Sequence, residues 1–294
     1  MNLLNIYSRY PDQESCIEHL EDLRFGDHPY CPLCNSKNVA RKCDGHRVGR
    51  WNCHQCKSSF NVLSGTIFEK TRVPLQKWFM AIGLMSNAKK SISSHQLARD
   101  LDITQPTALY VQARIRAEMA SKQQEIMLQG IVEIDETFIG GKPRKSNNHD
   151  SDDQPSNKRG RGTKKQAVIG AVERGGDVVT AIPPDLSGRS IMHFVQDNVE
   201  ADGSLLMTDE FKGYWPVHRK FAHSVINHSK EYVRGITHTN TIEGFWSLVK
   251  RAWYGTHHHY SLKYMMLYLS EAGWKYNNRK NEQSFNTFLR GCFA

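Results

Sequence analysis

THTNTIEGFWSLVKRAWY, the stretch from Thr237 to Tyr254, indicates one amphipathic helix. At helical spacing, its side chains divide between an apolar and a polar face. The apolar face holds Ile242, Phe245, Trp246, Val249, Ala252 and Trp253, and the polar face holds Asn240, Glu243, Ser247 and Lys250. Glu243 and Lys250 lie two turns apart and face the same way, an arrangement that an ordinary solvated helix also shows.

Two aspartates upstream of this helix belong to strand-like runs: one lies within a run closed by Gly140 and Gly141, and the other follows an apolar run that predicts a buried strand. Asp135 lies in IVEIDETFIGG, and Asp209 follows the run Leu205–Met207. These two aspartates and the helix-borne Glu243 can converge on Mg²⁺, which takes a few carboxylate oxygens and keeps positions open for water and phosphate. Two such ions about 4 Å apart can activate an attacking oxygen and stabilise a leaving one. The acids therefore predict phosphoryl transfer on nucleic acid, with Lys250 against a phosphate.

The strand that carries the first aspartate offers three acids rather than one. Over residues 131–138, alternation places Glu133 and Asp135 on one face and the apolar side chains on the other. Glu133 and the neighbouring Glu136 are therefore rivals of Asp135 on the residues alone.

Around these acids the pattern predicts an α/β fold. In chain order we expect two strands joined by a tight turn, a helix, the strand that delivers Asp209, and a C-terminal helix, at 166–173, 177–183, 187–199, 205–208 and 261–279. Three strands, a helix, a strand and a later helix with Glu243 are the order expected of an RNase H-like α/β core.

Asp135, Asp209 and Glu243, followed by Lys250 on the same helix, resemble the DDE-plus-lysine signature of bacterial and archaeal insertion-sequence transposases. The phrases IDETFIGGK, TDEFKGY and HTNTIEGFWSLVKR are similar to the motif blocks of the ISXO-like group, and the resemblance covers almost the whole chain. It implies an RNase H-like catalytic core and selects Asp135 over its rivals. Some relatives use asparagine at the third acidic position, so Asn240, one helical turn before Glu243, is a secondary candidate there.

The resemblance also implies an activity. Such an enzyme binds the terminal inverted repeats of its element, cleaves DNA at the element ends and joins the 3′ ends to target DNA, using Mg²⁺ or Mn²⁺, with two ions expected. A homo-oligomer is expected, because two ends are handled together. The alternative is a DNA-binding regulator whose RNase H-like domain is inactive, although an intact acidic triad argues against it. A nuclease that acts on RNA or hybrids without rejoining is a third possibility.

Length, charge and composition agree with a DNA partner. The chain has 294 residues, a formal charge of +9 and a pI near 9.2, which suits a polyanion but is also common in proteins that never bind DNA. No apolar stretch approaches the roughly 20 residues that span a bilayer, and the N-terminus lacks a targeting pattern. We expect a cytoplasmic, nucleoid-associated protein with three domains, 1–68, 69–128 and 129–294.

Four of the seven cysteines form two CxxC pairs. The pairs are Cys31 with Cys34 and Cys53 with Cys56, at a separation that closes one tetrahedral Zn²⁺ site. Four thiolates leave no open position, so the ion is expected to be structural, in an N-terminal zinc ribbon. Cys43, His46 and His54 are weaker candidates. Arg41 and Trp51, between the pairs, either contact DNA or belong to the ribbon surface.

A helical region follows the ribbon. Residues 73–88 predict an apolar helix, and residues 91–119 predict a helix, a short turn and a second helix that carries Arg114 and Arg116. This pattern is typical of a helix-turn-helix whose second helix enters the major groove, and a plain helical hairpin is its alternative. Under the DNA-binding interpretation the second helix supplies contacts from Gln105, Thr107, Tyr110, Gln112 and Arg114.

Further basic residues are candidates for contacts to the DNA backbone. The segment 142–165 is strongly basic and predicts a loop that either grips DNA or is a solvated insertion. Its candidate contacts are Lys158, Arg159, Arg161, Lys164 and Lys165, to which Lys250 and Arg251 of the first helix are added. His238, just before that helix, is a secondary candidate for proton transfer, with helix capping as the alternative.

Overall fold

The computed structural model describes residues 2–42, 49–123, 125–140, 165–226 and 238–293, and the chain forms two compact units. The first unit comprises Met1–Lys122 and Asn278–Ala294, and the second comprises Gln123–Asn277. The predicted division into 1–68, 69–128 and 129–294 stays a prediction, because compact packing does not test which segments fold alone.

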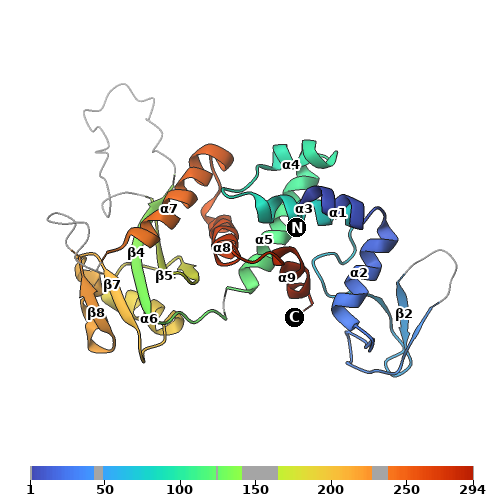
Figure 1. Ribbon diagram of the computed structural model, residues 1–294, viewed down its shortest axis with the longest axis horizontal. Coiled ribbons are helices and arrows are strands. Elements are labelled where there is room, and N and C mark those ends of the chain that lie inside the picture. Colours follow the sequence, from blue (N-terminus) through green and yellow to red (C-terminus); the bar gives the residue numbers. More distant parts are fainter. Residues whose placement is uncertain (1, 43–48, 124, 141–164, 227–237, 294) are drawn as a thin grey trace, which may run out of the picture. The chain divides into compact units, whose positions relative to one another are not determined.

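The first unit holds a group of helices and a small sheet (Figure 1). Its helices are α1 (Leu3–Arg9), α2 (Gln13–Phe25), α3 (Leu75–Asn87), α4 (Ser94–Leu101), α5 (Gln105–Ser121) and α9 (Ser284–Gly291). Asp12 begins α2 by accepting the backbone N–H of Ser15 at 2.8 Å. The predicted helix, turn and helix are present as α4 and α5, with Asp102 between them in the left-handed region at φ 48°.

The small sheet forms the ribbon. Strands β1 (Val39–Arg41), β2 (Arg50–Cys53) and β3 (Ser59–Asn61) are antiparallel in the order β1-β2-β3. Glu21 of α2 is buried, accepts the indole N–H of Trp51 at 2.8 Å and forms an ion pair with Arg41. These two ribbon side chains therefore hold the sheet to α2 inside the unit.

The second unit is built on a five-stranded mixed sheet (Figure 1). Its strands are β4 (Ile131–Ile139), β5 (Gln166–Glu173), β6 (Val178–Ala181), β7 (Leu205–Thr208) and β8 (Ala222–Val225). The order is β6-β5-β4-β7-β8, in which β4 pairs antiparallel with β5 and parallel with β7. The predicted RNase H-like α/β core is confirmed, and β4, which carries Asp135, is the central strand.

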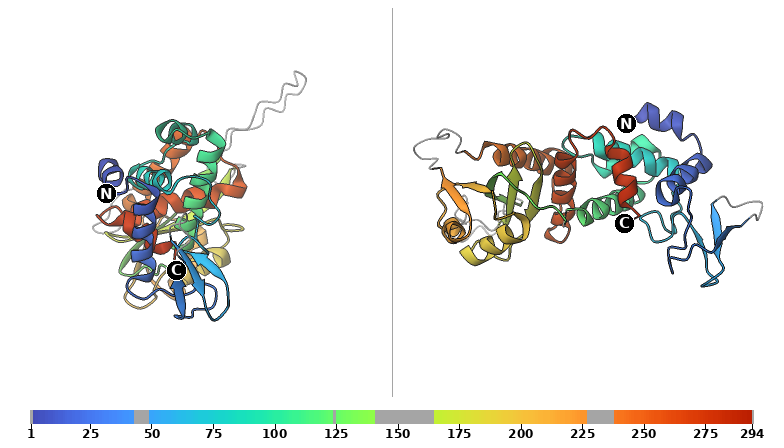
Figure 2. Two further views of the ribbon diagram at one scale, coloured as in Figure 1. Left: turned by 90° about the vertical axis from the view of Figure 1, so that its right-hand side faces the viewer. Right: turned by 60° about the horizontal axis from the view of Figure 1, so that its bottom comes forward.

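Helices cover both faces of this sheet (Figure 2). Helix α6 (Gly188–Asn198) and the 3₁₀ segment η2 (Lys212–Arg219) pack on one face, around Val132 and Ile134 of β4. Helices α7 (Asn240–Ala252) and α8 (Met265–Asn277) pack on the other. Glu133 and Asp135 belong to this second face, because residues alternate along a strand.

Helix α7 packs closely against the sheet through the side that the sequence predicts. Ile242, Phe245, Trp246 and Val249 are buried there. Opposite them, β5 carries Gly170, the pairing partner of Asp135. A Cβ atom on Gly170 would lie 2.6 Å from the Trp246 ring, so only glycine lets the helix come this near to the strand.

The chain leaves α7 through a short π-helical turn, η3 (Trp253–His257), and a 3₁₀ turn, η4 (Leu262–Tyr264), before it enters α8. Among the described residues, no helix has the length and the apolar character that crossing a membrane requires.

Candidate active site and zinc site

The topology of the sheet brings the two predicted aspartates together. Strands β4 and β7 run parallel with Glu133 opposite Met207, so Asp209, just past the end of β7, lies beside Asp135. Carboxylate oxygens of Asp135, Glu136 and Asp209 all lie within 4.8 Å of one another. Three hard oxygen donors at this spacing fit a divalent cation of the Mg²⁺ type.

Glu136 is the member of this group that the sequence left as a rival only. Its Oε2 accepts a hydrogen bond from the hydroxyl of Tyr214 at 2.7 Å. Burial, followed by the charges of Glu136 and Asp135, holds the pKa of Tyr214 well above its ordinary value, so this hydroxyl stays a donor. Two adjacent acids in one strand were the only sequence signal, since the partner tyrosine lies far along the chain.

Within the acidic group, formed by Asp135, Glu136 and Asp209, the ionised form of Asp135 is disfavoured. Burial, then the charge of Glu136 and then that of Asp209, raises the pKa of Asp135 to about 7, and the charge of Glu243 adds to this. Like charges close together in a partly dry site disfavour the ionised form, and a bound cation reverses that preference.

The third predicted acid lies on α7. Glu243 is exposed, and its Oε1 accepts a hydrogen bond from the Thr239 hydroxyl at 3.0 Å. It is not among the three acids whose oxygens lie within 4.8 Å of one another, although its charge reaches Asp135. Asn240, the secondary candidate, is also exposed on the first turn of α7. The structure thus brings together Asp135 and Asp209, with Glu243 nearby on a facing helix.

A basic cavity adjoins the acidic group. It has a volume of about 350 Å³, and its lining includes Glu136, Lys165, Lys250, Trp253 and Tyr254. Two lysines and an exposed tyrosine in one cavity are the kinds of side chain that contact phosphates and bases. Arg251, the next residue on α7, is exposed.

His238 lies in a buried network on the α7 face of the sheet. Its Nδ1 lies 3.2 Å from Oε1 of Glu133 and 3.0 Å from a terminal nitrogen of Arg174. With its proton on Nε2, His238 accepts from Arg174 through Nδ1; with its proton on Nδ1, it donates to Glu133 instead.

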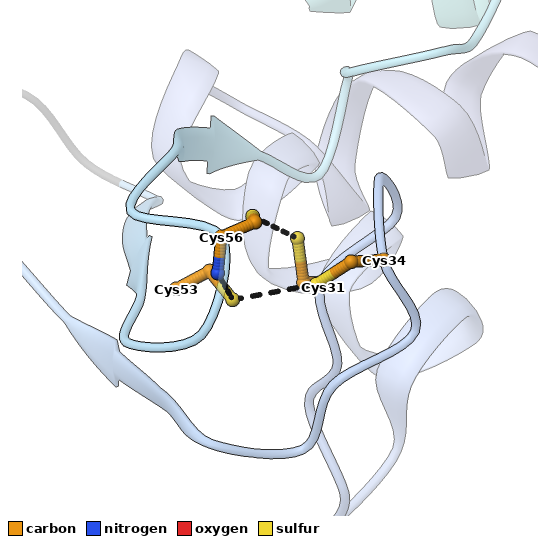
Figure 3. Close-up of side chains that lie close together, drawn as sticks. All are labelled: Cys31, Cys34, Cys53 and Cys56. Carbon is orange, nitrogen blue, oxygen red and sulfur yellow. Dashed lines mark hydrogen bonds between the residues drawn. The ribbon is translucent and has the colours of Figure 1, made fainter.

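The predicted zinc ligands meet in the ribbon (Figure 3). The sulfurs of Cys31, Cys34, Cys53 and Cys56 lie within 4.8 Å of one another. The Sγ atoms of Cys31 and Cys56 are 3.7 Å apart, and those of Cys34 and Cys53 are 3.6 Å apart. A tetrahedral Zn²⁺ with Zn–S bonds of about 2.3 Å places its ligand sulfurs about 3.8 Å apart, so the four cysteines fit structural zinc.

The two arginines predicted to contact DNA are not freely displayed on α5. Arg114 is partly buried and donates to the carbonyl oxygen of Thr66 at 3.2 Å, and Arg116 is 1% exposed. Gln112 is buried and donates to the carbonyl oxygen of Ile92. Tyr110 is 45% exposed. Lys158, Arg159, Arg161 and Lys164 of the basic segment lie outside the described residues, as do Cys43 and His46.

A mixed RNase H-like sheet with paired aspartates at its centre, joined to a four-cysteine ribbon, defines a zinc-ribbon transposase. Residues 127–277 match the ISXO2-like transposase domain, and residues 11–59 match the transposase zinc-ribbon domain. The chain belongs to the ISXO2-like transposase family.

One relative is described as an uncharacterized protein in transposable element ISH50 of Halobacterium salinarum. It is 31% identical over 252 residues, which cover 81% of this chain and 82% of the relative. Among solved structures, a pre-cleavage Mos1 transpososome is 13% identical with a TM-score of 0.26, covering 69% of this chain and 74% of that one. At this TM-score the similarity carries no weight for fold or function.

Proposed function

We propose that this transposase binds the terminal inverted repeats of an insertion sequence, cleaves the DNA at the element ends and joins the freed 3′ ends to target DNA. One observation carries the proposal: Asp135 in the middle of β4 and Asp209 just past the end of β7 lie side by side on neighbouring parallel strands, with oxygens within a single ion's reach. A carboxylate pair at this position suits metal-assisted phosphoryl transfer, in which no side chain serves as the nucleophile.

The chemistry of each residue indicates its role in this proposal. Asp135 and Asp209 hold divalent cations, Mg²⁺ or Mn²⁺, and Glu243 approaches from α7 to complete the ligand set. When bound, a pair of such ions activates the attacking oxygen and stabilises the leaving one. Lys250 and Lys165, which line the adjoining cavity, contact the phosphates of the DNA end.

Other parts of the proposal rest on the sequence and the family. The α4 and α5 pair and the basic segment 142–165 contact DNA, and copies of the chain assemble so that two element ends are handled together. The protein works on DNA in the cytoplasm, at the nucleoid. The relative's description, which places it in a transposable element, supports an insertion sequence as the element on which this chain acts.

The test is cleavage of the DNA that flanks the gene, with purified protein and Mg²⁺ or Mn²⁺. Asp135→Asn, Asp209→Asn and Glu243→Gln are expected to lower the cleavage rate by at least about 100-fold, and Asn240→Ala to leave most of it. Glu136→Gln shows whether the third clustered acid takes part. Metal-dependent cleavage at the wild-type rate in all three acid variants would overturn the proposal.

A further inference from the structure

We propose that Glu133 is a positioning residue, which caps α7 from β4 and fixes Glu243 and Lys250 relative to Asp135. The inference rests on the proposed function for its purpose, and on the buried contacts of Glu133 for its evidence. Glu133 belongs neither to the predicted triad of Asp135, Asp209 and Glu243 nor to the clustered acids, which are Asp135, Glu136 and Asp209.

Glu133 supplies the hydrogen-bond acceptors that the start of α7 lacks. Its Oε2 accepts the backbone N–H of Thr241 at 2.7 Å and that of Ile242 at 3.1 Å. Its Oε1 accepts the Thr241 hydroxyl at 2.9 Å. First-turn N–H groups of a helix have no partner within the helix, so an acceptor must come from elsewhere. Here it comes from the central strand of the sheet.

The N-cap residue of α7 does not cap the helix with its own side chain. Thr239 stands at that position and makes no side-chain capping hydrogen bond, while its hydroxyl donates to Glu243 at 3.0 Å. The N-cap residue thus orients the candidate metal ligand, and Glu133 takes over the capping. A negative charge at this end is also favoured by the helix dipole.

Arg174 ties this cap to the rest of the sheet. Its Nε donates to Oε1 of Glu133 at 2.5 Å, and a terminal nitrogen donates to the carbonyl oxygen of His238 at 2.9 Å. The same nitrogen lies 3.0 Å from the sulfur of Met207 on β7. One guanidinium therefore joins β4, β7 and the segment that enters α7.

The contacts exclude Glu133 as a metal ligand. Its side chain is 0% exposed, and each of its oxygens accepts two hydrogen bonds, from Arg174, Thr241 and Ile242. It shares a face of β4 with Asp135, two residues away. One carboxylate thus sets the separation between the strand that carries the first aspartate and the helix that carries Glu243. Catalytic groups must be held to within about 0.5 Å of their productive positions, so a carboxylate that fixes this separation supports catalysis.

The test uses the full-length, zinc-loaded protein with Glu133→Gln, which keeps the shape but removes the charge and one acceptor. The matched control is Glu173→Gln, because Glu173 ends β5 and accepts the backbone N–H of Gln129 at 3.2 Å. Three quantities are measured well below the unfolding midpoint: amide hydrogen exchange in the first turn of α7, Mn²⁺ affinity, and the single-turnover cleavage rate alongside the Kd for DNA.

We expect Glu133→Gln to speed exchange at Thr241 and Ile242 at least about tenfold, to weaken Mn²⁺ binding about tenfold and to slow cleavage about 10- to 100-fold, while the Kd for DNA changes less than about twofold. The control is expected to change none of these. A purely structural role would lower the unfolding midpoint but leave α7 exchange and Mn²⁺ affinity at wild-type values, and that result would overturn the proposal.

Thr241→Val serves if Glu133→Gln does not fold, because it removes only the hydroxyl that donates to Glu133. It is expected to shift exchange and Mn²⁺ affinity in the same direction by a smaller factor, and wild-type values for both would count against the inference. If wild-type protein fails to cleave the flanking DNA, the proposed function fails, and α7 exchange with Mn²⁺ affinity alone decides whether Glu133 positions the helix.

Discussion

At the scale of single residues, the ionisation of Asp135 affects both the stability of the fold and the binding of a metal ion. Its pKa is raised to about 7 from 3.8, first by burial and then by Glu136 and Asp209. The folded state therefore binds more protons than the unfolded state between about pH 4 and pH 7, so stability falls as pH rises through that range. The ionised aspartate that suits metal binding is the form that the protein without bound Mg²⁺ tolerates least.

Asp135→Asn should therefore stabilise the protein while it abolishes activity. Without added divalent cation, we expect its unfolding midpoint to exceed that of wild type by about 2–6 °C at pH 8 and by much less at pH 4.5. Added Mg²⁺ should raise the wild-type midpoint and leave the variant unmoved. Thermal unfolding measured at both pH values checks this prediction. A difference in midpoint between variant and wild type that grows toward low pH would contradict it.

The acidic residues also show which features of the site a sequence pattern can predict. Asp209 was predictable because it follows an apolar run, whereas Asp135 was selected from its rivals Glu133 and Glu136 by the family resemblance. The parallel pairing of β4 with β7, which brings the two aspartates together, was not predicted. Glu133 was visible only as a rival, because the groups that it caps lie 108 and 109 residues away along the chain. A sequence pattern reports local periodicity, and the partner of a buried carboxylate is not local.

At the scale of elements, periodicity predicted the strands at 131–138, 166–173 and 205–208 and the apolar face of α7, whereas β8 and α9 were not predicted. The sequence did not predict how closely α7 packs against the sheet, because a glycine inside a strand, here Gly170, does not indicate which element packs against it. On α5, the helical pattern was right, but the burial of Gln112 and Arg116 depends on tertiary packing that their polarity does not reveal.

Gly170→Ala should push α7 away from the strand that carries Asp135. The added Cβ would lie 2.6 Å and 2.9 Å from two atoms of the rigid Trp246 ring. We expect a loss of about 1–3 kcal/mol in the free energy of unfolding and slower cleavage. Gly244→Ala is the control for stability, because nothing lies within 4 Å of its added Cβ and alanine favours a helix. Equal stability of the two variants would contradict this packing.

Zinc should hold the ribbon together. Cys34→Ser leaves three thiolates, and we expect the protein to lose its equivalent of bound zinc and the amide protection of β1, β2 and β3, because structural zinc sites contribute to folding directly. His54→Ala, which alters an exposed histidine beside a ligand, should keep both. Zinc content by mass spectrometry and hydrogen exchange measure the outcome. A fully protected ribbon without zinc would exclude a structural ion.

At the scale of the whole molecule, the charge of +9 should make DNA binding depend on salt. Alanine at Lys158, Arg159, Arg161 and Lys164 together should flatten the plot of log affinity against log salt, by about 0.9 for each DNA phosphate that the variant no longer neutralises. The slope is measured by titrating labelled element-end DNA at several salt concentrations. An unchanged slope would show that the basic segment is a solvated insertion, the alternative that the sequence left open.

The central claim is that Asp135 and Asp209 lie at the centre of a site that cuts and rejoins DNA. It is tested most directly by incubating wild-type protein and Asp209→Asn with paired element ends and target DNA in Mg²⁺ or Mn²⁺, and by sequencing the joined strands. We predict element 3′ ends joined to target DNA with wild type and none with the variant. Joined strands from Asp209→Asn, or wild-type protein that binds both ends but neither cuts nor joins them, would contradict the account.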